Sequence, residues 1–183
     1  MSNKIKFSFQ GVKGAYSELA GKNLYPNSIS IPCKTFEEMF ESVRKQDADV
    51  ALVPIENSRA GRVADTQRLI PDSNLKIIGE YFLEINHCLV AIPGTSLNDI
   101  KRIHSHEQAI AQCRNNIIKN KKEMVVSADT AGAAKQISEL KNKEDAAISS
   151  QLAADPWHSH EDDPWAARPG PAGDAAPRRL GKR

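Results

Sequence analysis

The chain has 183 residues, a formal net charge of +2 and 26% charged residues. This length suffices for one substantial domain or for two small lobes, each with a core. A charge balance so near zero argues against a nucleic-acid or anionic membrane partner, and no apolar run is long enough to cross a bilayer. Residues 1–11 lack a signal-peptide pattern, so we expect a cytoplasmic protein.

Residues 4–154 alternate between strand-like and helix-like patterns, which predicts an α/β fold with mostly parallel sheets. Extended segments are predicted at residues 4–9, 28–32, 49–55, 100–105, 123–128 and 145–150. Helices are predicted at residues 14–23, 35–46, 61–70, 107–120 and 130–141. A further extended run at 75–92 is too long for one strand of a compact sheet. We expect the chain to pass there from one lobe to the other.

The composition changes abruptly after Ala154. Residues 155–183 hold five of the ten prolines, and Leu180 is their only aliphatic side chain larger than alanine. Lys outnumbers Arg by 14 to 6 before this point, but the ratio after it is 1 to 4. Such a segment cannot bury enough apolar surface to offset its ordering entropy. We expect a disordered or non-native tail, and a native flexible tail is the alternative.

Four predicted strands end in a polar or glycine-rich turn that opens a helix. The turns are GVKGAYS, ENSRAG, SHEQA and ADTAGAA, and the expected N-cap residues are Ser17, Ser58, Ser105 and Thr130. In open α/β sheets ligands bind outside the carboxyl ends of the strands, where helix N-termini present N–H groups and a partial positive charge. These turns, with Glu56 and Asn57, suit an anionic ligand. Plain helix capping stays open as the alternative.

Capping boxes are predicted at Thr35 with Glu38 and at Ser105 with Gln108, because each pair has the required spacing. The thiols Cys33, Cys88 and Cys113 are widely spaced, so they are expected to pack as small apolar groups.

Other chemical motifs are weak. His104 and His106 form an H-x-H pair, which recurs in the tail, but no third ligand accompanies it, so we expect no metal site. His87 and Cys88 lie within an apolar run, where a core pair is expected rather than a base and a nucleophile. No phosphate-binding glycine motif is present, and we expect no cofactor.

Several spaced motifs nevertheless resemble those of the prephenate dehydratase family. They run in order from about Lys4 to Ala154 and comprise FQGVKGAYSELA, VALVPIENSRAGRV, INHCLVAIPG, IHSHEQAIAQC, SADTAGAA and AAISSQLAA. The resemblance implies two lobes facing each other across a cleft, as in type II periplasmic binding proteins, which we divide at 1–82 and 83–154. It implies decarboxylation and dehydration of prephenate to phenylpyruvate. The implied substrate-binding residues are Glu56, Asn57, Ser58, Ser105, Gln112 and Thr130.

The sequence departs from the family after AAISSQLAA. The family's Thr-Arg-Phe segment, whose threonine is thought to assist departure of the hydroxyl, has no counterpart here, and no threonine follows Thr130. Glu56, Asn57 and Ser105 are the remaining catalytic candidates. We therefore expect a C-terminally incomplete catalytic domain without an ACT regulatory domain, impaired turnover, and a homo-oligomer formed through uncovered apolar surface. A small-anion binding module and an arogenate dehydratase are the alternatives.

Overall fold

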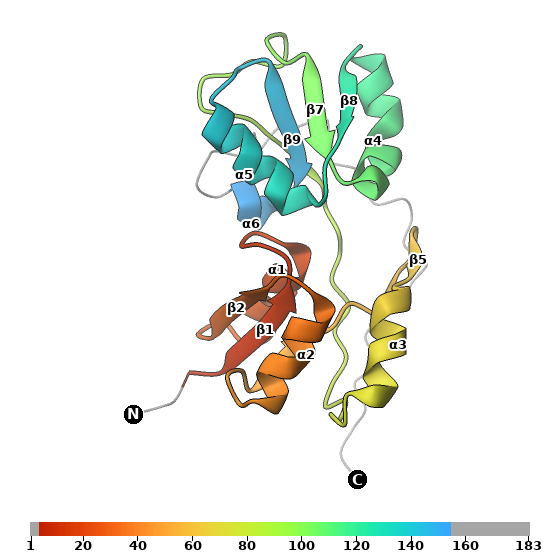
Figure 1. Ribbon diagram of the computed structural model, residues 1–183. Coiled ribbons are helices and arrows are strands. Elements are labelled where there is room, and N and C mark those ends of the chain that lie inside the picture. The colour runs from red at the N-terminus through yellow and green to blue at the C-terminus, as the bar shows by residue number, and fades with distance from the viewer. Residues whose placement is uncertain (1–3, 155–183) are drawn as a thin grey trace.

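The computed structural model describes residues 4–154, which form two α/β lobes joined by an extended connection (Figure 1). The tail predicted at 155–183 lies outside the described residues. The first lobe contains β1 (Lys6–Gln10), α1 (Tyr16–Leu24), β2 (Ile29–Cys33), α2 (Phe36–Arg44), β3 (Val50–Leu52), β4 (Glu56–Asn57), β5 (Gly61–Arg62) and α3 (Ala64–Asp72). The second lobe contains β6 (Cys88–Val90), β7 (Arg102–Ser105), α4 (Glu107–Lys119), β8 (Glu123–Val126), α5 (Thr130–Leu140), β9 (Asp145–Ser149) and α6 (Gln151–Ala154).

The first lobe is built on a parallel three-stranded sheet in the order β2-β1-β3. On one face Phe7 is fully buried and meets α1 so closely that a Cβ at Gly21 would lie 2.2 Å from its ring. On the other face the Ser8 hydroxyl donates to the Met39 carbonyl at 3.2 Å, which ties β1 to α2. Alternation along β1 thus gives each face its own helix layer.

The strand predicted at 49–55 is shorter and less buried than its apolar sequence indicates. Only Val50–Leu52 pairs with the sheet, all three residues are half-buried, and Ile55 is 42% exposed. Among the described residues β3 stands at the edge of the sheet, with β1 as its one strand neighbour. The extended segment predicted at 49–55 therefore forms a strand only in part, and its apolar side chains stay partly exposed because an edge strand is covered by fewer neighbours than a central one.

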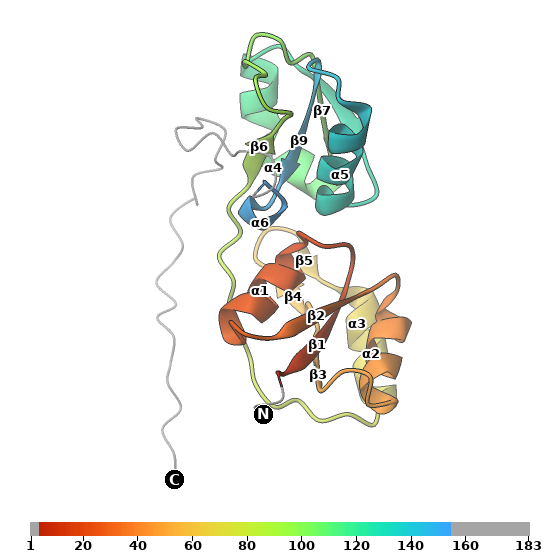
Figure 2. The same cartoon turned by 90° about the vertical axis from the view of Figure 1, so that its left-hand side faces the viewer.

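The connection between the lobes runs along one side of the molecule (Figure 2). Residues 75–87 connect the lobes without pairing with any strand of the described part of the chain, and of the predicted run at 75–92 only Cys88–Val90 joins a sheet. Ile77, Ile78 and Phe82 in this connection are 76–78% exposed. The expected lobe boundary between residues 82 and 83 falls inside this segment and stays a prediction.

The second lobe has a four-stranded sheet in the order β6-β9-β7-β8, with α4 and α5 on opposite faces (Figure 1). Only β6 runs antiparallel to its neighbour, so the predicted α/β fold with mostly parallel sheets is confirmed. Every residue of β9 is buried. Ile103 and Ile148 pack toward α4 with Ile117, whereas Ala147 packs toward Ile137 of α5.

The strand directions place the carboxyl ends of strands from the two lobes opposite one another. The carboxyl end of β1 points toward the second lobe, and those of β7 and β9 point toward the first (Figure 1). In α/β sheets this is the edge where ligands bind. Among the described residues, no helix is both long enough and apolar enough to span a membrane.

Candidate active site

The glycine-rich turn after β1 is held by a buried carboxylate. Glu18 is 2% exposed, and its carboxylate accepts hydrogen bonds from the Gly14 amide and the Ser30 hydroxyl, both at 2.7 Å. Burial opposes ionisation, but these two bonds and the nearby Lys22 keep the pKa of Glu18 below its ordinary value. Glu18 therefore fixes the turn as a carboxylate. Ser17 was expected to cap α1, but the N-cap is Ala15, which makes no side-chain cap.

The same turn touches the second lobe. The Ser150 hydroxyl donates to the Gly14 carbonyl at 2.5 Å, and a Cβ at Gly14 would lie 2.8 Å from the Cβ of Ala153. Gly14 also has a φ of +91°, a conformation that side-chain-bearing residues rarely adopt. Glycine is required here by both the backbone and the close approach of the lobes.

Tyr16, His87 and Gln112 form a hydrogen-bonded chain across the lobe junction. The Tyr16 hydroxyl lies 2.7 Å from His87 Nδ1, and His87 Nε2 lies 3.1 Å from Gln112 Oε1. Burial is the main reason that the pKa of His87 lies below its ordinary value, although its contact with Gln112 acts the other way. Burial also raises the pKa of Tyr16 far above its ordinary value. Both side chains are therefore neutral at physiological pH.

His87 is 4% exposed and hydrogen-bonded at both ring nitrogens, and the adjacent Cys88 is half-buried. A satisfied histidine inside the fold agrees with the core pair predicted from the sequence. The other two cysteines, Cys33 and Cys113, are buried as expected.

The ENSRAG segment is a two-stranded hairpin rather than a helix start. Asn57 Oδ1 accepts from the backbone amides of Arg59 at 2.9 Å and Ala60 at 3.0 Å, so its carbonyl oxygen builds the turn. Its amide nitrogen is the end that remains for a ligand. Glu56 and Ser58 are exposed on the same hairpin. Ser58 is not an N-cap. Residues 61 and 62 form the second strand of the hairpin, and α3 begins only after its N-cap Val63.

Ser105 is the last residue of β7, and its side chain links two strands of the sheet. Its hydroxyl is fully buried and donates to the Ile148 carbonyl at 2.7 Å, which links β7 to β9. The N-cap of α4 is the next residue, His106, whose ring nitrogen accepts from the Gln108 amide at 3.3 Å. The predicted cap and capping box at Ser105 were therefore wrong, since its hydroxyl is already engaged across the sheet.

Thr130 is the first residue of α5 and is half-buried. The N-cap is Asp129, whose carboxylate accepts from the Gly132 amide at 2.6 Å. A carboxylate caps well because it also meets the partial positive charge of the helix start. The prediction of Thr130 as the cap was wrong by one residue, and this leaves the Thr130 hydroxyl outside the capping interaction.

Ser149, at the carboxyl end of β9, was missed by the sequence analysis. Its hydroxyl is fully buried and has no hydrogen-bond partner among the described residues. Unpaired buried polar groups are uncommon because each carries a desolvation cost. Its place in the motif AAISSQLAA, at the end of a predicted strand, was the available signal.

The H-x-H pair is divided between separate roles. His104 Nε2 bonds to Asp145 Oδ1 at 2.9 Å, and Asp145 begins β9 at the end remote from the junction, whereas His106 caps α4. Within residues 4–154 no group of three or more His, Cys, Asp or Glu side chains is placed to hold a metal ion. The second H-x-H pair, at 158–160, lies outside the described residues.

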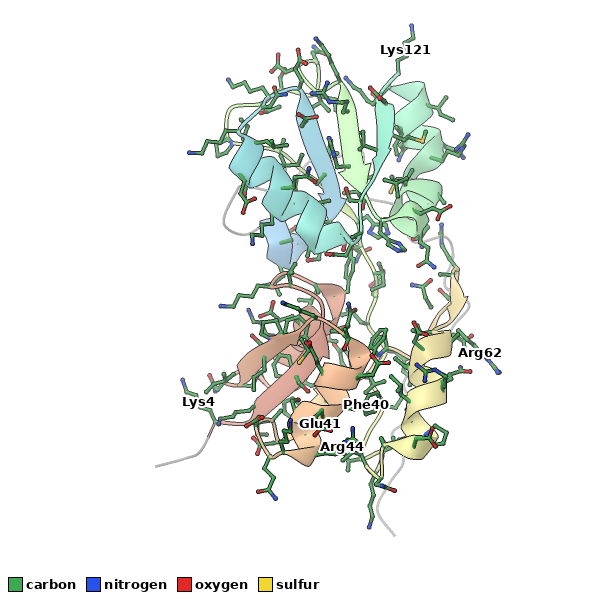
Figure 3. The ribbon with its side chains drawn as sticks, in the orientation of Figure 1. Lys4, Phe40, Glu41, Arg44, Arg62 and Lys121 are labelled. Atoms are coloured by element: carbon green, nitrogen blue, oxygen red, sulfur yellow. The ribbon has the colours of Figure 1, made fainter. Side chains whose placement is uncertain are left out.

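Several cations point away from the junction. Lys4, Arg44 and Lys121 lie toward the outer ends of the lobes, and Arg62 extends into solvent from the hairpin (Figure 3). Arg59 lies on the hairpin turn, and its positive charge contributes to the lowered pKa of His87. The turns at the strand ends combine neutral side chains such as Asn57 and Thr130 with the charged residues Lys13 and Arg59.

The family model that describes prephenate dehydratase matches residues 7–158. The chain belongs to the prephenate dehydratase family. A bifunctional N-acyl-homoserine lactone acylase/prephenate dehydratase from Komagataeibacter europaeus is 43% identical over 85% of this chain and 55% of its own length. Arogenate dehydratase/prephenate dehydratase 2 from Arabidopsis thaliana is 41% identical over 83% of this chain and 40% of its own length.

Solved structures of the family share this fold. Prephenate dehydratase from Arthrobacter aurescens, determined in complex with L-Phe, matches with a TM-score of 0.77 and 36% identity over 83% of this chain and 52% of its own. The enzyme from Staphylococcus aureus matches with a TM-score of 0.68 and 25% identity over 83% and 56%. The chain thus spans about half the length of these prephenate dehydratases.

Proposed function

We propose that this chain binds prephenate at the lobe junction and converts it to phenylpyruvate as a carbon–oxygen lyase. The match over residues 7–158, which includes the hairpin and both helix starts described above, carries the proposal. The proposed binding residues are Glu56, Asn57, Ser58, Ser105, Gln112 and Thr130. Ser105 would contribute by fixing the end of β7, because its own hydroxyl is bonded to Ile148.

The chemistry of the junction suits this reaction. Prephenate carries two carboxylates. The start of α4 offers N–H groups with partial positive charge, whereas at the start of α5 the Asp129 carboxylate already offsets part of that charge. The ring carboxylate leaves as neutral carbon dioxide, its bonding electrons enter the ring, and the departing hydroxide takes a proton to become water. A strong positive charge on that carboxylate would oppose its loss. Neutral donors such as the Asn57 and Gln112 amides and the Thr130 hydroxyl avoid this penalty.

Turnover by a polypeptide of this sequence is expected to be slow. The sequence contains no Thr-Arg-Phe, and loss of one transition-state donor typically lowers the rate by about 10²–10³. A prephenate turnover assay beside calorimetric titration tests both parts. Binding with slow turnover supports the proposal, and addition of a family-type segment containing Thr-Arg-Phe should raise the rate. Absence of binding contradicts the proposal, and full turnover without that segment contradicts the expected impairment.

Arogenate is a second candidate substrate. Relatives from Arabidopsis thaliana and Petunia hybrida that are named arogenate dehydratases are 39–42% identical to this chain. Arogenate has an amino group where prephenate has a keto oxygen, so a carboxylate near that position would favour it. The exposed Glu56 is such a group. Parallel titrations with both compounds, repeated on Glu56→Gln, would show which substrate is preferred and whether Glu56 decides it.

Acylase activity is a further candidate, because a relative 43% identical over 85% of this chain is named a bifunctional N-acyl-homoserine lactone acylase/prephenate dehydratase. Incubation with an N-acyl-homoserine lactone, followed by detection of the released fatty acid, tests this activity separately. Absence of fatty acid would remove the candidate without affecting the dehydratase proposal.

We propose a cytoplasmic location and self-association for this chain. The buried thiols Cys33 and Cys113 agree with a reducing compartment. Ile77, Ile78 and Phe82 form an exposed apolar strip on the connection, and such surfaces favour association. Sedimentation at increasing protein concentration should show reversible association, and replacement of these three residues by serine should reduce it. A monomer at all concentrations would contradict this proposal.

A further inference from the structure

The Tyr16–His87–Gln112 chain connects three separate parts of the fold. Tyr16 begins α1 in the first lobe, His87 precedes β6 at the end of the connection, and Gln112 lies in the second turn of α4. The Tyr16 hydroxyl also lies 3.1 Å from the Asn86 carbonyl and 3.2 Å from the Ser149 carbonyl. The Tyr16 hydroxyl thereby adds a contact between the lobes, beside the bond from Ser150 to the Gly14 carbonyl.

The tautomer of His87 links these contacts to the orientation of Gln112. In the arrangement described, His87 Nε2 faces the carbonyl oxygen of Gln112, so Nε2 must carry the proton. Nδ1 then has a free lone pair and accepts from the Tyr16 hydroxyl. Both ring nitrogens are satisfied, and the Gln112 amide nitrogen is the end left for a ligand.

The other tautomer of His87 would require the Gln112 side-chain amide to turn over. With the proton on Nδ1, His87 would donate to the Tyr16 oxygen, and Tyr16 would donate to the carbonyl of Asn86 or Ser149. His87 Nε2 would then be an acceptor, and Gln112 would have to turn its amide nitrogen toward it. Its carbonyl oxygen would face the ligand, which is unfavourable for a carboxylate. The direction of the hydrogen bond between Tyr16 and His87 therefore determines which end of Gln112 is presented.

We propose that Tyr16 and His87 are positioning residues that hold the Gln112 amide with its nitrogen toward the ligand. The inference rests on the proposed function, because it takes Gln112 as a neutral donor to a substrate carboxylate. The rigid path from hydroxyl to imidazole to amide also makes this donor depend on contact between the lobes. Gln112 is thus correctly oriented only when α1 of the first lobe touches the end of the connection.

The first test is a double-mutant cycle with prephenate as the calorimetric probe. Tyr16→Phe keeps the ring and removes the hydroxyl, and we expect about fivefold weaker binding. In a Gln112→Ala background the same change should cost less than about twofold, because Tyr16 acts through Gln112. Equal effects of Tyr16→Phe in both backgrounds would indicate a purely structural role and would overturn the proposal.

Tyr81→Phe is the matched control. The Tyr81 hydroxyl accepts an exposed hydrogen bond from the Asn23 side-chain amide at 3.2 Å, six residues before His87 on the connection. This variant loses the same chemical group, and its prephenate affinity should equal that of the wild type. Thermal unfolding of each variant checks that the fold is retained.

Nitrogen NMR of the His87 ring and of the Gln112 side chain provides a readout that needs no substrate. The proposal requires the Nε2–H tautomer in the wild type, and it requires the Gln112 amide signals to move in Tyr16→Phe but not in Tyr81→Phe. An Nδ1–H tautomer would overturn it. If prephenate and arogenate both fail to bind the wild type, the proposed function fails, and these signals alone decide whether Tyr16 and His87 orient Gln112.

Discussion

The two lobes use the same α/β design but differ in how completely they are covered. The second lobe encloses β9 on both faces, and all five of its residues are buried. The first lobe leaves β3 half-buried at the edge of its sheet, and the connection that follows it exposes Ile77, Ile78 and Phe82. The second lobe therefore carries most of the enclosed core, and the first depends more on what covers its edge.

The lobes also differ in where each holds a buried carboxylate. Asp145 lies at the amino end of β9, bonded to Arg102 and His104, which is the end remote from the junction. Glu18 lies beside the junction and fixes the backbone of Gly14. In the second lobe the buried charge stabilises the scaffold, whereas in the first it shapes the candidate site.

The largest expected difference concerns Asp145. Replacement by alanine leaves Arg102 and His104 without their carboxylate, and breaking a buried pair in this way costs about 3–5 kcal/mol. The neighbouring Glu144→Ala change removes an exposed pair with Lys101 and should cost less than about 1 kcal/mol. Denaturant unfolding followed by circular dichroism measures both. Similar losses in the two variants would show that Asp145 has no special role in the second lobe.

The next largest difference between the second lobe and the connection is expected when an isoleucine side chain is truncated in each. Ile103→Ala creates a cavity beneath α4, since this side chain is fully buried, and we expect a loss of about 2–5 kcal/mol. Ile78→Ala in the connection removes the same atoms from a residue that is 76% exposed, so the loss should be below about 0.5 kcal/mol. A large loss at Ile78 would mean that the connection is covered in solution, which would weaken the contrast between the lobes.

Acid should destabilise the second lobe through Asp145. Its hydrogen bond with Arg102 is the main reason that its pKa falls from 3.8 to about 2. A lowered folded-state pKa gives stability that is complete above pH ~4 and disappears as the pH falls through ~2. The loss amounts to about 2 kcal/mol for this shift. Unfolding free energies measured across this pH window should show the decline in the wild type, and Asp145→Asn should lack most of it.

The smallest stability effect is expected in the first lobe, at Gly21. Gly-to-Ala inside a helix normally stabilises, but here the new Cβ would lie 2.2 Å from the Phe7 ring. Overpacking should dominate and cost about 1–3 kcal/mol. Gly79→Ala is the control, because a Cβ added there would meet no atom within 4 Å. A stabilised Gly21→Ala variant would show that the first lobe repacks easily and is less rigid than described.

Hydrophobic periodicity predicted most helices and strands, because the spacing of apolar residues along an element depends on which of its faces is buried. The helix at Phe36–Arg44 was predicted together with its cap, and Thr35 Oγ1 accepts from the Glu38 amide at 3.1 Å. In a full capping box the Glu38 carboxylate would accept from the backbone amide of Thr35. Here it accepts from the backbone amide of Lys34 instead. The partial exposure of β3 could not be predicted for a different reason. Strand order within a sheet is a tertiary property that local sequence does not contain.

The candidate site was predictable only in outline. The strand ends that gather at the junction follow from the α/β alternation, and the motifs lie at these strand ends, but the site itself stays a prediction. Helix caps were misplaced at Ser105 and Thr130, because a neighbouring side chain supplied the capping group. The bond between Tyr16 and His87 joins residues 71 positions apart, and no local pattern encodes such a contact.

The central claim, a ligand site formed jointly by both lobes, is tested most directly by mapping prephenate binding on the ¹⁵N-labelled chain. The account predicts saturable shifts of backbone amides from both lobes, in the turn after β1, in the hairpin and at the starts of α4 and α5. These shifts should weaken in parallel when Gln112 is replaced by alanine. Shifts confined to one lobe, or to the outer ends of the molecule, would contradict the claim.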